Sequence, residues 1–428
     1  MDISENYKKF ISENKTEREC INTIRNNLIN CGFIDMFGLN KISDGDKIVA
    51  TKMNKALMAF KIGKKPVEEG INILCAHVDS PRLDIKMNPL YNDKGLIFFD
   101  THYYGGIRNY QWVARPLAIH GVVCKKDGSI ININIGEKET DPIFYISDLL
   151  PHLAYKDDFI SGEELDVIIG NNPSENDNVE DNILNILKET YNIERYDLQS
   201  SELEVVPAGS ARDVGFDRNL IVGYGHDDRS CAYASYEAFI ADNDTPERTS
   251  CLLLVDKEEI GSNGATGLDS NLLENIVAEL IYANGGNELT LRRCLANSNI
   301  LSSDVNAAFD PHHSDLFDSN NTSYLGKGAA FCKFTGSGGK YESNDANPEY
   351  FAKIRSILDE KSIPYQTSEL GKVDKGGGGT IAYLAARYGM NTIDVGLPVL
   401  AMHAPCEIID KRDLNSCADI YFEFLRRM

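Results

Sequence analysis

The chain has little positive charge, no clustered cysteines and no long apolar segment. Its 428 residues carry 43 Lys and Arg against 65 Asp and Glu, a net charge of -22, which argues against nucleic acid or an anionic membrane surface as a partner. The ten cysteines show no Cys-x-x-Cys spacing, and a chain of this length does not need disulfides to fold, so we expect reduced thiols. No apolar run reaches membrane-spanning length, and the first residues, Met1 to Lys8, are polar. We therefore expect a cytoplasmic protein.

Length and pattern indicate two domains. The composition, 42% hydrophobic and 25% charged, is that of an ordinary globular protein, but 428 residues exceed what one core usually supports. From about 91 to 215, short strand patterns and turns replace the alternation of strands and helices found on either side, and 170–179 is expected to be an exposed loop. No sustained repeat is visible. We predict a larger α/β domain, discontinuous over 1–90 and 216–428, with a smaller, mainly β domain inserted at 91–215.

The most informative segment is Cys251 to Ser262. Its first five residues, Cys251 to Val255, are apolar and fit a strand buried on both faces of a mainly parallel sheet. Four charged residues, Asp256 to Glu259, follow at the carboxyl end of that strand, where open α/β sheets bind their ligands. Because neighbouring side chains on an extended segment point in opposite directions, Glu258 and Glu259 are expected to differ in role. One would bind a metal and the other would face water, whereas a solvated acidic loop is the alternative for this pair taken alone.

Other apolar runs also end on a potential metal ligand. The run Ile71 to Ala76 leads to His77, with Asp79 two residues later. An imidazole in this position can bind a metal while the carboxylate accepts the other ring N–H and fixes the tautomer. Apolar residues likewise precede Asp304 and His403.

Two adjacent acids and a run of glycines complete the candidate site. Asp227 and Asp228 follow a brief strand and begin a helix, so either could bridge two metal ions or cap the helix. The glycines at 376–379 are not a phosphate-binding loop, because no Lys-Ser/Thr pair follows them. We expect them to let the backbone approach a ligand closely.

These positions supply nitrogen and oxygen donors without a thiolate. The candidate ligands are His77, Asp227, Glu259, Asp304 and His403. Such a set suits two hydrolytic Zn²⁺ ions, although Co²⁺ or Mn²⁺ would also fit, and a bridging carboxylate holds such a pair roughly 3.5–4 Å apart. Glu258 is then left to take a proton from the water between the metals and to pass it to a leaving amine.

Five motifs occur in order along the chain: His77-Val-Asp-Ser-Pro, Gly225-His-Asp-Asp-Arg, Asp256-Lys-Glu-Glu-Ile-Gly, Ser302-Ser-Asp304 and Ala401-Met-His403-Ala-Pro. They resemble the motifs of the M18 metalloaminopeptidases, the aspartyl aminopeptidase family, across nearly the whole chain. The chain departs from the family in Met402-His403-Ala404, where Met-His-Ser is frequent, and this leaves the ligand intact.

The resemblance assigns roles within the site. His77 and Asp304 would bind one zinc ion, Glu259 and His403 the other, and Asp227 would bridge the two. It selects Asp227 over its neighbour, because the family's bridging residue is the first of its acidic pair. It also makes Glu258 the general base and Asp79 the partner of His77.

The resemblance further implies a zinc-exopeptidase-like catalytic domain that acts on peptides, with an inserted domain for dimerisation and a homododecameric assembly. His152 is similar to a histidine that reaches the active site of a partner subunit in relatives, and Lys333 and Tyr341 lie where relatives contact substrate. Selection of an acidic first residue would require a cation, because a buried unpaired carboxylate is costly. Lys333 is the candidate, with Lys327 and Lys340 as competitors, and some family members take neutral residues.

Two alternatives remain at this point. The chain could be another dinuclear exopeptidase or deacylase, such as an M42 or M20 enzyme, or a catalytically idle shell-forming or cargo-binding protein. Retention of every candidate ligand together with Glu258 favours an enzyme.

Overall fold

The computed structural model describes residues 2–39, 41–153, 159–173 and 178–428. The chain divides into two compact units. The larger comprises Met1–Asp79, Ala211–Met402 and Glu407–Met428, and the smaller comprises Ser80–Ser210 and His403–Cys406. Within the described ranges, no helix combines the length and the apolarity needed to cross a membrane.

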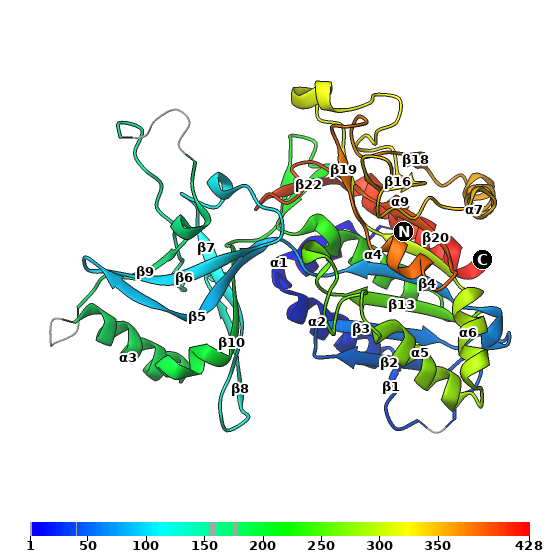
Figure 1. Cartoon of the computed structure of the whole chain (residues 1–428), viewed down its shortest axis with the longest axis horizontal. Helices are drawn as coiled ribbons and strands as arrows, with labels where there is room; N and C mark the ends of the chain where they lie inside the picture. Colours follow the sequence, from blue (N-terminus) through cyan, green and yellow to red (C-terminus); the bar gives the residue numbers. More distant parts are fainter. Residues whose placement is uncertain (1, 40, 154–158, 174–177) are drawn as a thin grey trace. The chain divides into compact units, whose positions relative to one another are not determined.

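A nine-stranded sheet forms the centre of the larger unit (Figure 1). In spatial order its strands are β1 (Ile34–Asp35), β2 (Lys47–Lys52), β3 (Ala56–Lys61), β13 (Ser250–Val255), β4 (Asn72–His77), β14 (Asn299–Ser303), β20 (Asn391–Gly396), β16 (Ala329–Cys332) and β18 (Tyr365–Thr367). The four strands β13, β4, β14 and β20 are mutually parallel. β3 and β16, which flank them, run antiparallel to β13 and β20, respectively. The carboxyl ends of the four central strands therefore meet at one edge of the sheet.

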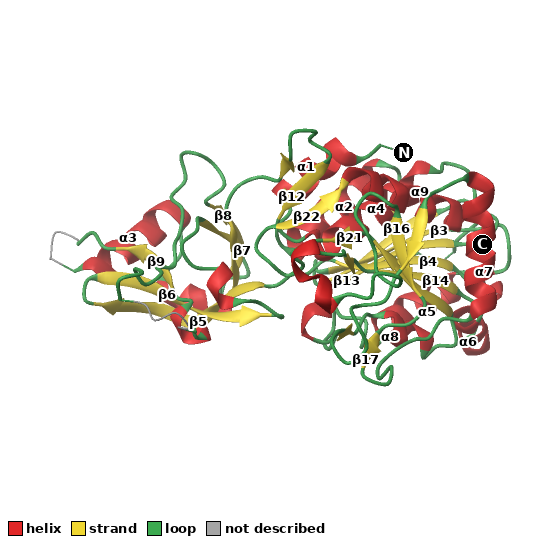
Figure 2. Ribbon diagram, turned by 90° about the horizontal axis from the view of Figure 1, so that it is seen from above, coloured by secondary structure: helices red, strands yellow, loops and turns green. Residues whose placement is uncertain are grey.

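Helices cover both faces of this sheet (Figure 2). One face carries α1 (Ser4–Glu13), α2 (Glu17–Asn30), α4 (His226–Ala241), α7 (Pro348–Lys361) and α9 (Lys411–Arg427), and the other carries α5 (Leu272–Ala283), α6 (Glu288–Ala296) and α8 (Ala382–Ala386). Each face of the sheet has its own hydrophobic core, the first under α1, α2, α4, α7 and α9 and the second under α5, α6 and α8. In β13, Leu252 and Leu254 belong to the first core, while Cys251, Leu253 and Val255 belong to the second. Burial on both faces explains the uninterrupted apolar run of this strand.

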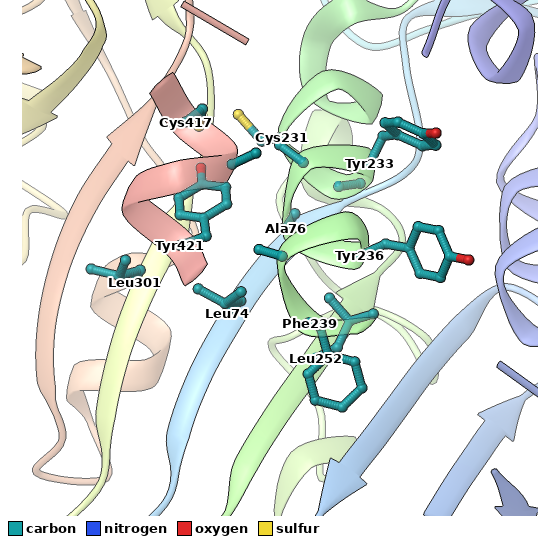
Figure 3. Close-up of a cluster of buried hydrophobic side chains, with 14 of the residues drawn as sticks. Leu74, Ala76, Cys231, Tyr233, Tyr236, Phe239, Leu252, Leu301, Cys417 and Tyr421 are labelled. Carbon is teal, nitrogen blue, oxygen red and sulfur yellow. The ribbon is translucent and has the colours of Figure 1, made fainter. Parts of the chain in front are cut away.

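Figure 3 shows the first core, where side chains from two helices pack on the central strands. Phe239 of α4 and Tyr421 of α9 are both buried, beside Leu74, Leu252 and Leu301 of the sheet. This packing fixes the axis of α4, the helix whose second residue is the predicted metal ligand Asp227.

The amino-terminal residues form two helices. Their apolar residues at helical spacing are buried, at Tyr7, Phe10, Ile11, Ile21, Ile24 and Leu28. The pattern nevertheless breaks between α1 and α2, because Thr16 starts a new helix. Its hydroxyl accepts the N–H of Glu19, and the Glu19 carboxylate accepts the N–H of Thr16, which satisfies the first amides of α2.

The smaller unit is built on a six-stranded antiparallel sheet. Its strands, in spatial order, are β8 (Ile130–Ile135), β7 (Leu117–Cys124), β10 (Ser201–Pro207), β5 (Arg82–Asp93), β6 (Leu96–Tyr104) and β9 (Val167–Gly170). The helix α3 (Val179–Tyr191) packs on β5, β6 and β9, and Asn178 caps it by accepting the amides of Glu180 and Asp181. The sequence prediction placed a loop up to residue 179 and missed this helix.

The boundaries of the smaller unit differ from those predicted. It begins at Ser80 rather than 91, because β5 is one continuous strand from Arg82 to Asp93. It ends at Ser210 rather than 215, because β11 (Arg212–Val214) pairs with β12 (Leu220–Gly223), which pairs in turn with β22 (Glu407–Asp410) of the larger unit.

Two short strand pairs complete the larger unit. β15 (Asn306–Ala307) pairs with β21 (Pro398–Val399), and β17 (Gly336–Ser337) pairs with β19 (Gly377–Gly378). The glycines expected to approach a ligand thus approach another backbone segment. A Cβ at residue 377 would lie 2.9 Å from the Gly336 carbonyl oxygen, and its φ of 145° favours glycine.

Candidate metal centre

His77 is the last residue of β4, and Asp79 holds its ring. Nδ1 of His77 lies 3.1 Å from the carbonyl oxygen of Asp79 and 3.2 Å from its carboxylate Oδ1. Both oxygens are acceptors, so Nδ1 carries the ring proton and donates it. Nε2 then presents its lone pair on the opposite side of the ring, which is the tautomer that a metal-binding imidazole requires there.

Three carboxylates surround Nε2 of His77. Oδ1 of Asp227 lies at 3.2 Å, Oε2 of Glu258 at 3.9 Å and Oδ1 of Asp304 at 4.0 Å. A buried lone pair and the carboxylates around it repel one another unless a cation lies among them. Burial by itself lowers the pKa of His77, but the contacts with Asp227 and Asp79 outweigh it and raise that pKa well above its ordinary value. The site therefore favours positive charge at this point.

Asp227 occupies the centre of this arrangement. Donor atoms of two groups of three residues lie within 4.8 Å of one another: His77, Asp227 and Glu259, and Asp227, Asp228 and Asp304. Asp227 is shared by both groups. Its backbone N–H donates to Oε2 of Glu407 at 3.0 Å, which fixes the start of α4.

Asp228 differs from Asp227 in its contacts. Its Oδ2 accepts the backbone N–H of His77 at 3.3 Å, and the peptide bond between Asp227 and Asp228 is cis. One oxygen of Asp228 thus holds the end of β4, whereas Asp227 faces both groups of donors.

Glu258 and Glu259 lie in a 3-10 turn, Glu258–Ile260, and not in extended backbone. The prediction assumed extended backbone, in which successive side chains point in opposite directions, and that assumption was wrong. Successive side chains of a 3-10 turn are about 120° apart. The turn is held by Asp79, whose Oδ1 accepts the N–H of Glu258 and whose Oδ2 accepts the N–H of Glu259, both at 3.2 Å. Asp79 thus links the His77 ring to the backbone of both glutamates.

Asp304 and His403 occupy different units. Asp304 follows β14, and burial first and Glu258 next raise the pKa of its carboxyl well above the ordinary value. His403 is grouped with the smaller unit, where its Nδ1 donates to the carbonyl of Gly106 at 3.0 Å. Metal binding by His403 would then use Nε2, and its place as a fifth ligand stays a prediction.

The predicted substrate-binding residues are exposed. His152 lies in a turn of the smaller unit, and 74% of Tyr341 is exposed. Lys333 is in an ion pair with Asp345, with Nζ 2.6 Å from Oδ1. Its competitor Lys340 lies 3.5 Å from the same carboxylate.

The sequence prediction missed two residues that position the site. Glu407 holds the backbone of Asp227, but one acid among 65 gives no local signal. Gly106 lies so close to His403 that an added Cβ would be 3.3 Å from Nδ1. Its place in the unusual segment Tyr103-Tyr-Gly-Gly was the available signal.

Imidazole and carboxylate donors gathered at the carboxyl ends of sheet strands are typical of a metal-dependent enzyme centre. Without a thiolate, the donor set fits Zn²⁺ in a hydrolytic role. The fold and the site therefore identify the class as metallohydrolase.

Comparison with known proteins gives the family. The family model described as "Aminopeptidase I zinc metalloprotease (M18)" matches residues 10–425. The probable M18 family aminopeptidase 1 of Clostridium acetobutylicum is 49% identical, over 99% of this chain and 94% of that protein. The chain belongs to the M18 family and is a zinc aminopeptidase.

Solved structures agree with this assignment. The M18 aminopeptidase of Thermotoga maritima superposes with a TM-score of 0.96 at 41% identity, covering 100% of this chain and 96% of that one. Aminopeptidase I of Clostridium acetobutylicum superposes with a TM-score of 0.91 at 47% identity, covering 99% and 95%. The mApe1 dodecamer of yeast shares the fold, with a TM-score of 0.83 at 21% identity, covering 100% and 97%.

Proposed function

We propose that this chain removes single residues from the amino end of peptides at a centre of two zinc ions, with Glu258 as the general base. The observation that carries the proposal is the position of Asp227, which belongs to two adjacent groups of metal donors. The family match favours this reaction over those of M42 or M20 enzymes and over a non-catalytic role.

The proposed ligands divide between the two ions. His77 and Asp304 would hold one, Glu259 and His403 the other, and Asp227 both. Asp79 supports this assignment because it fixes the His77 tautomer through Nδ1. When bound, the zinc ions would acidify the attacking water and polarise the scissile carbonyl.

Glu258 is not among the proposed zinc ligands and is therefore available for proton transfer. Its carboxylate lies at the edge of the cluster, with Oε2 3.9 Å from Nε2 of His77 and 18% of the side chain exposed. A carboxylate there would accept a proton from water and return it to the leaving amine. Because Asp79 binds the amides of both glutamates, it would hold the base and the ligand in a constant relation.

Side-chain selection is a finer part of the proposal. An acidic first residue would be bound by Lys333, which would exchange its ion pair with Asp345 for the substrate carboxylate. Because that exchange replaces one ion pair by another, we expect the preference for acidic over neutral residues to be modest. Tyr341 would contact the substrate from the same exposed region.

Assembly and location complete the proposal. The smaller unit would mediate self-association, with His152 reaching a neighbouring active site in a homododecamer. Apolar side chains close to His152 in the sequence are exposed, Leu150 by 49%, Leu153 by 65% and Phe159 by 82%, as a surface that becomes buried on association would require. All ten cysteines are free thiols, and we therefore propose the reducing cytoplasm as its location.

The test measures zinc per chain alongside hydrolysis of aminoacyl and N-acetylaminoacyl substrates. We expect two zinc ions per chain, cleavage of the aminoacyl substrates and none of the acylated ones. A single ion per fully active chain would contradict the dinuclear centre, and cleavage of the acylated substrates would instead support a deacylase.

A further inference from the structure

A cavity lies at the other end of the central strands from the candidate metal centre. Its volume is about 420 Å³, and it is formed by the ends of β3, α4 and α9, the loop after α4 and the start of β13. Ser250, the first residue of β13, lines the cavity, whereas Val255, the last, pairs with His77. A six-residue strand spans roughly 17 Å, so the cavity is separate from the metal centre.

Lys61 gives this cavity a buried cation. Only 5% of the residue is exposed, and Nζ donates to the backbone carbonyl of Asp242 at the end of α4. Nζ also lies 5.2 Å from the centre of the Phe239 ring. Across the described ranges, no carboxylate forms an ion pair with Lys61. An ammonium group has three N–H donors, and an anion in the cavity could accept hydrogen bonds from those that do not bind the Asp242 carbonyl.

Two of the three acids that line the cavity are neutralised by its other cations. Nε of Arg426 lies 3.2 Å from Oδ2 of Asp242, and Nζ of Lys64 lies 2.7 Å from Oε1 of Glu247. The third acid, Asp244, is exposed at the rim and forms no ion pair with any residue that the structure describes. The charges left over are therefore one buried cation and one carboxylate at the rim.

Part of the cavity wall is apolar. Phe239, Phe422 and Leu425 line the cavity, and its volume is in the range of about 300–1,000 Å³ usual for small-molecule sites. A multiply charged anion such as phosphate fits poorly, because three acids share the lining. A carboxylate that carries an ammonium group and an apolar side chain matches all three features.

We propose that this cavity binds a free amino acid with an apolar side chain, its carboxylate on Lys61 and its ammonium group on the carboxylate of Asp244 at the rim. Free amino acids are also what an aminopeptidase releases, so the enzyme would bind a molecule of its own product class at a site remote from the zinc ions. Burial lowers the pKa of Lys61 to about 8, which leaves it mainly charged at neutral pH.

The experiment titrates the zinc-loaded enzyme with L-leucine by calorimetry. The same titration is made on Lys61→Met, which keeps the length of the side chain but not its charge, and on Lys65→Met, an exposed lysine outside the cavity. We expect Lys61→Met to weaken leucine binding at least about tenfold, about 1.4 kcal/mol, and Lys65→Met to leave it unchanged. Binding at the active site is common to all three proteins, so the difference reports on the cavity. Equal binding by the three proteins would overturn the proposal.

Two analogues identify which groups are recognised. L-Leucinol lacks the carboxylate and should show no binding that depends on Lys61, whereas 4-methylpentanoate lacks the ammonium group and should bind several-fold more weakly than leucine. If 4-methylpentanoate binds as tightly as leucine, the cavity takes simple carboxylates and the amino-acid assignment is wrong.

A variant at the rim of the cavity tests the proposal even if Lys61→Met does not fold. Asp244→Asn changes an exposed side chain and should weaken leucine but not 4-methylpentanoate; an unchanged ratio of the two would count against the proposal. These measurements report binding and not turnover, so their failure would leave the proposed catalytic roles untouched.

Discussion

Replacement of Asp79 by Asn tests the link between the predicted metal ligand His77 and the turn that carries both glutamates. The carboxylate accepts three N–H donors, from Nδ1 of His77 and from the backbone of Glu258 and Glu259. An amide has one oxygen and one NH₂ group, so at least one of these donors would face another donor.

The magnitude follows from those contacts. Loss of one hydrogen bond to a charged group costs about 1.5–3 kcal/mol, and outer partners of metal ligands are typically worth about 10- to 100-fold in metal affinity or activity. Because the Asp79 carbonyl also accepts from Nδ1 of His77 at 3.1 Å, the tautomer is partly retained. We therefore expect zinc affinity to fall about tenfold. Turnover at saturating zinc should fall further, because the turn that carries Glu258 would be released.

The assay is competition for zinc with a chelator, followed by turnover at saturating zinc. The matched control is Asp413→Asn, another buried aspartate that accepts two backbone N–H groups, those of Gly326 and Gly328, both at 2.7 Å. The control should lower thermal stability without changing zinc affinity. Unchanged zinc affinity and turnover in Asp79→Asn, or equal loss of zinc in both variants, would refute the reasoning.

Four further predictions concern other parts of the chain. Glu258→Gln should keep its zinc and lose roughly 10²–10⁴-fold in turnover, whereas Glu259→Gln should bind zinc weakly and regain activity with excess zinc. Metal analysis combined with kinetics checks both variants. The reverse pattern would mean that Glu259 is the base and Glu258 the ligand. Lys333→Ala should lower the ratio of Asp to Leu hydrolysis several-fold in a paired substrate assay, and an unchanged ratio would exclude Lys333 from specificity. His152→Ala should lose most activity while sedimenting as a particle far larger than one 47.6 kDa chain, and a fully active monomer would end the idea of a residue shared between subunits. Burial lowers the pKa of Lys61 to about 8 from 10.5, so the native state releases this proton at a lower pH than the unfolded state does. As the pH rises from about 8 to about 10, the wild type should therefore gain stability relative to Lys61→Met, as measured by urea unfolding.

Local pattern was sufficient for the strands and for most candidate ligands. A central parallel strand is buried on both faces, so it reads as an apolar run, and the first polar residue after it marks the carboxyl edge of the sheet. His77, Asp304 and the pair Glu258 and Glu259 were found in this way. The structure brings these residues together, because β13, β4 and β14 are adjacent in the sheet.

What the sequence by itself determined was therefore the buried apolar runs of the central sheet and the candidate ligands at their ends, since each depends on neighbours within a few positions. Only the tertiary structure decided how these ligands are held. Asp79 binds the amide of Glu258 across 179 positions and Glu407 binds that of Asp227 across 180. The buried ammonium group of Lys61 likewise meets the end of α4 across 181. A hydrogen bond between distant segments leaves no periodic trace in either of them, because it depends only on where the folded chain brings the two together.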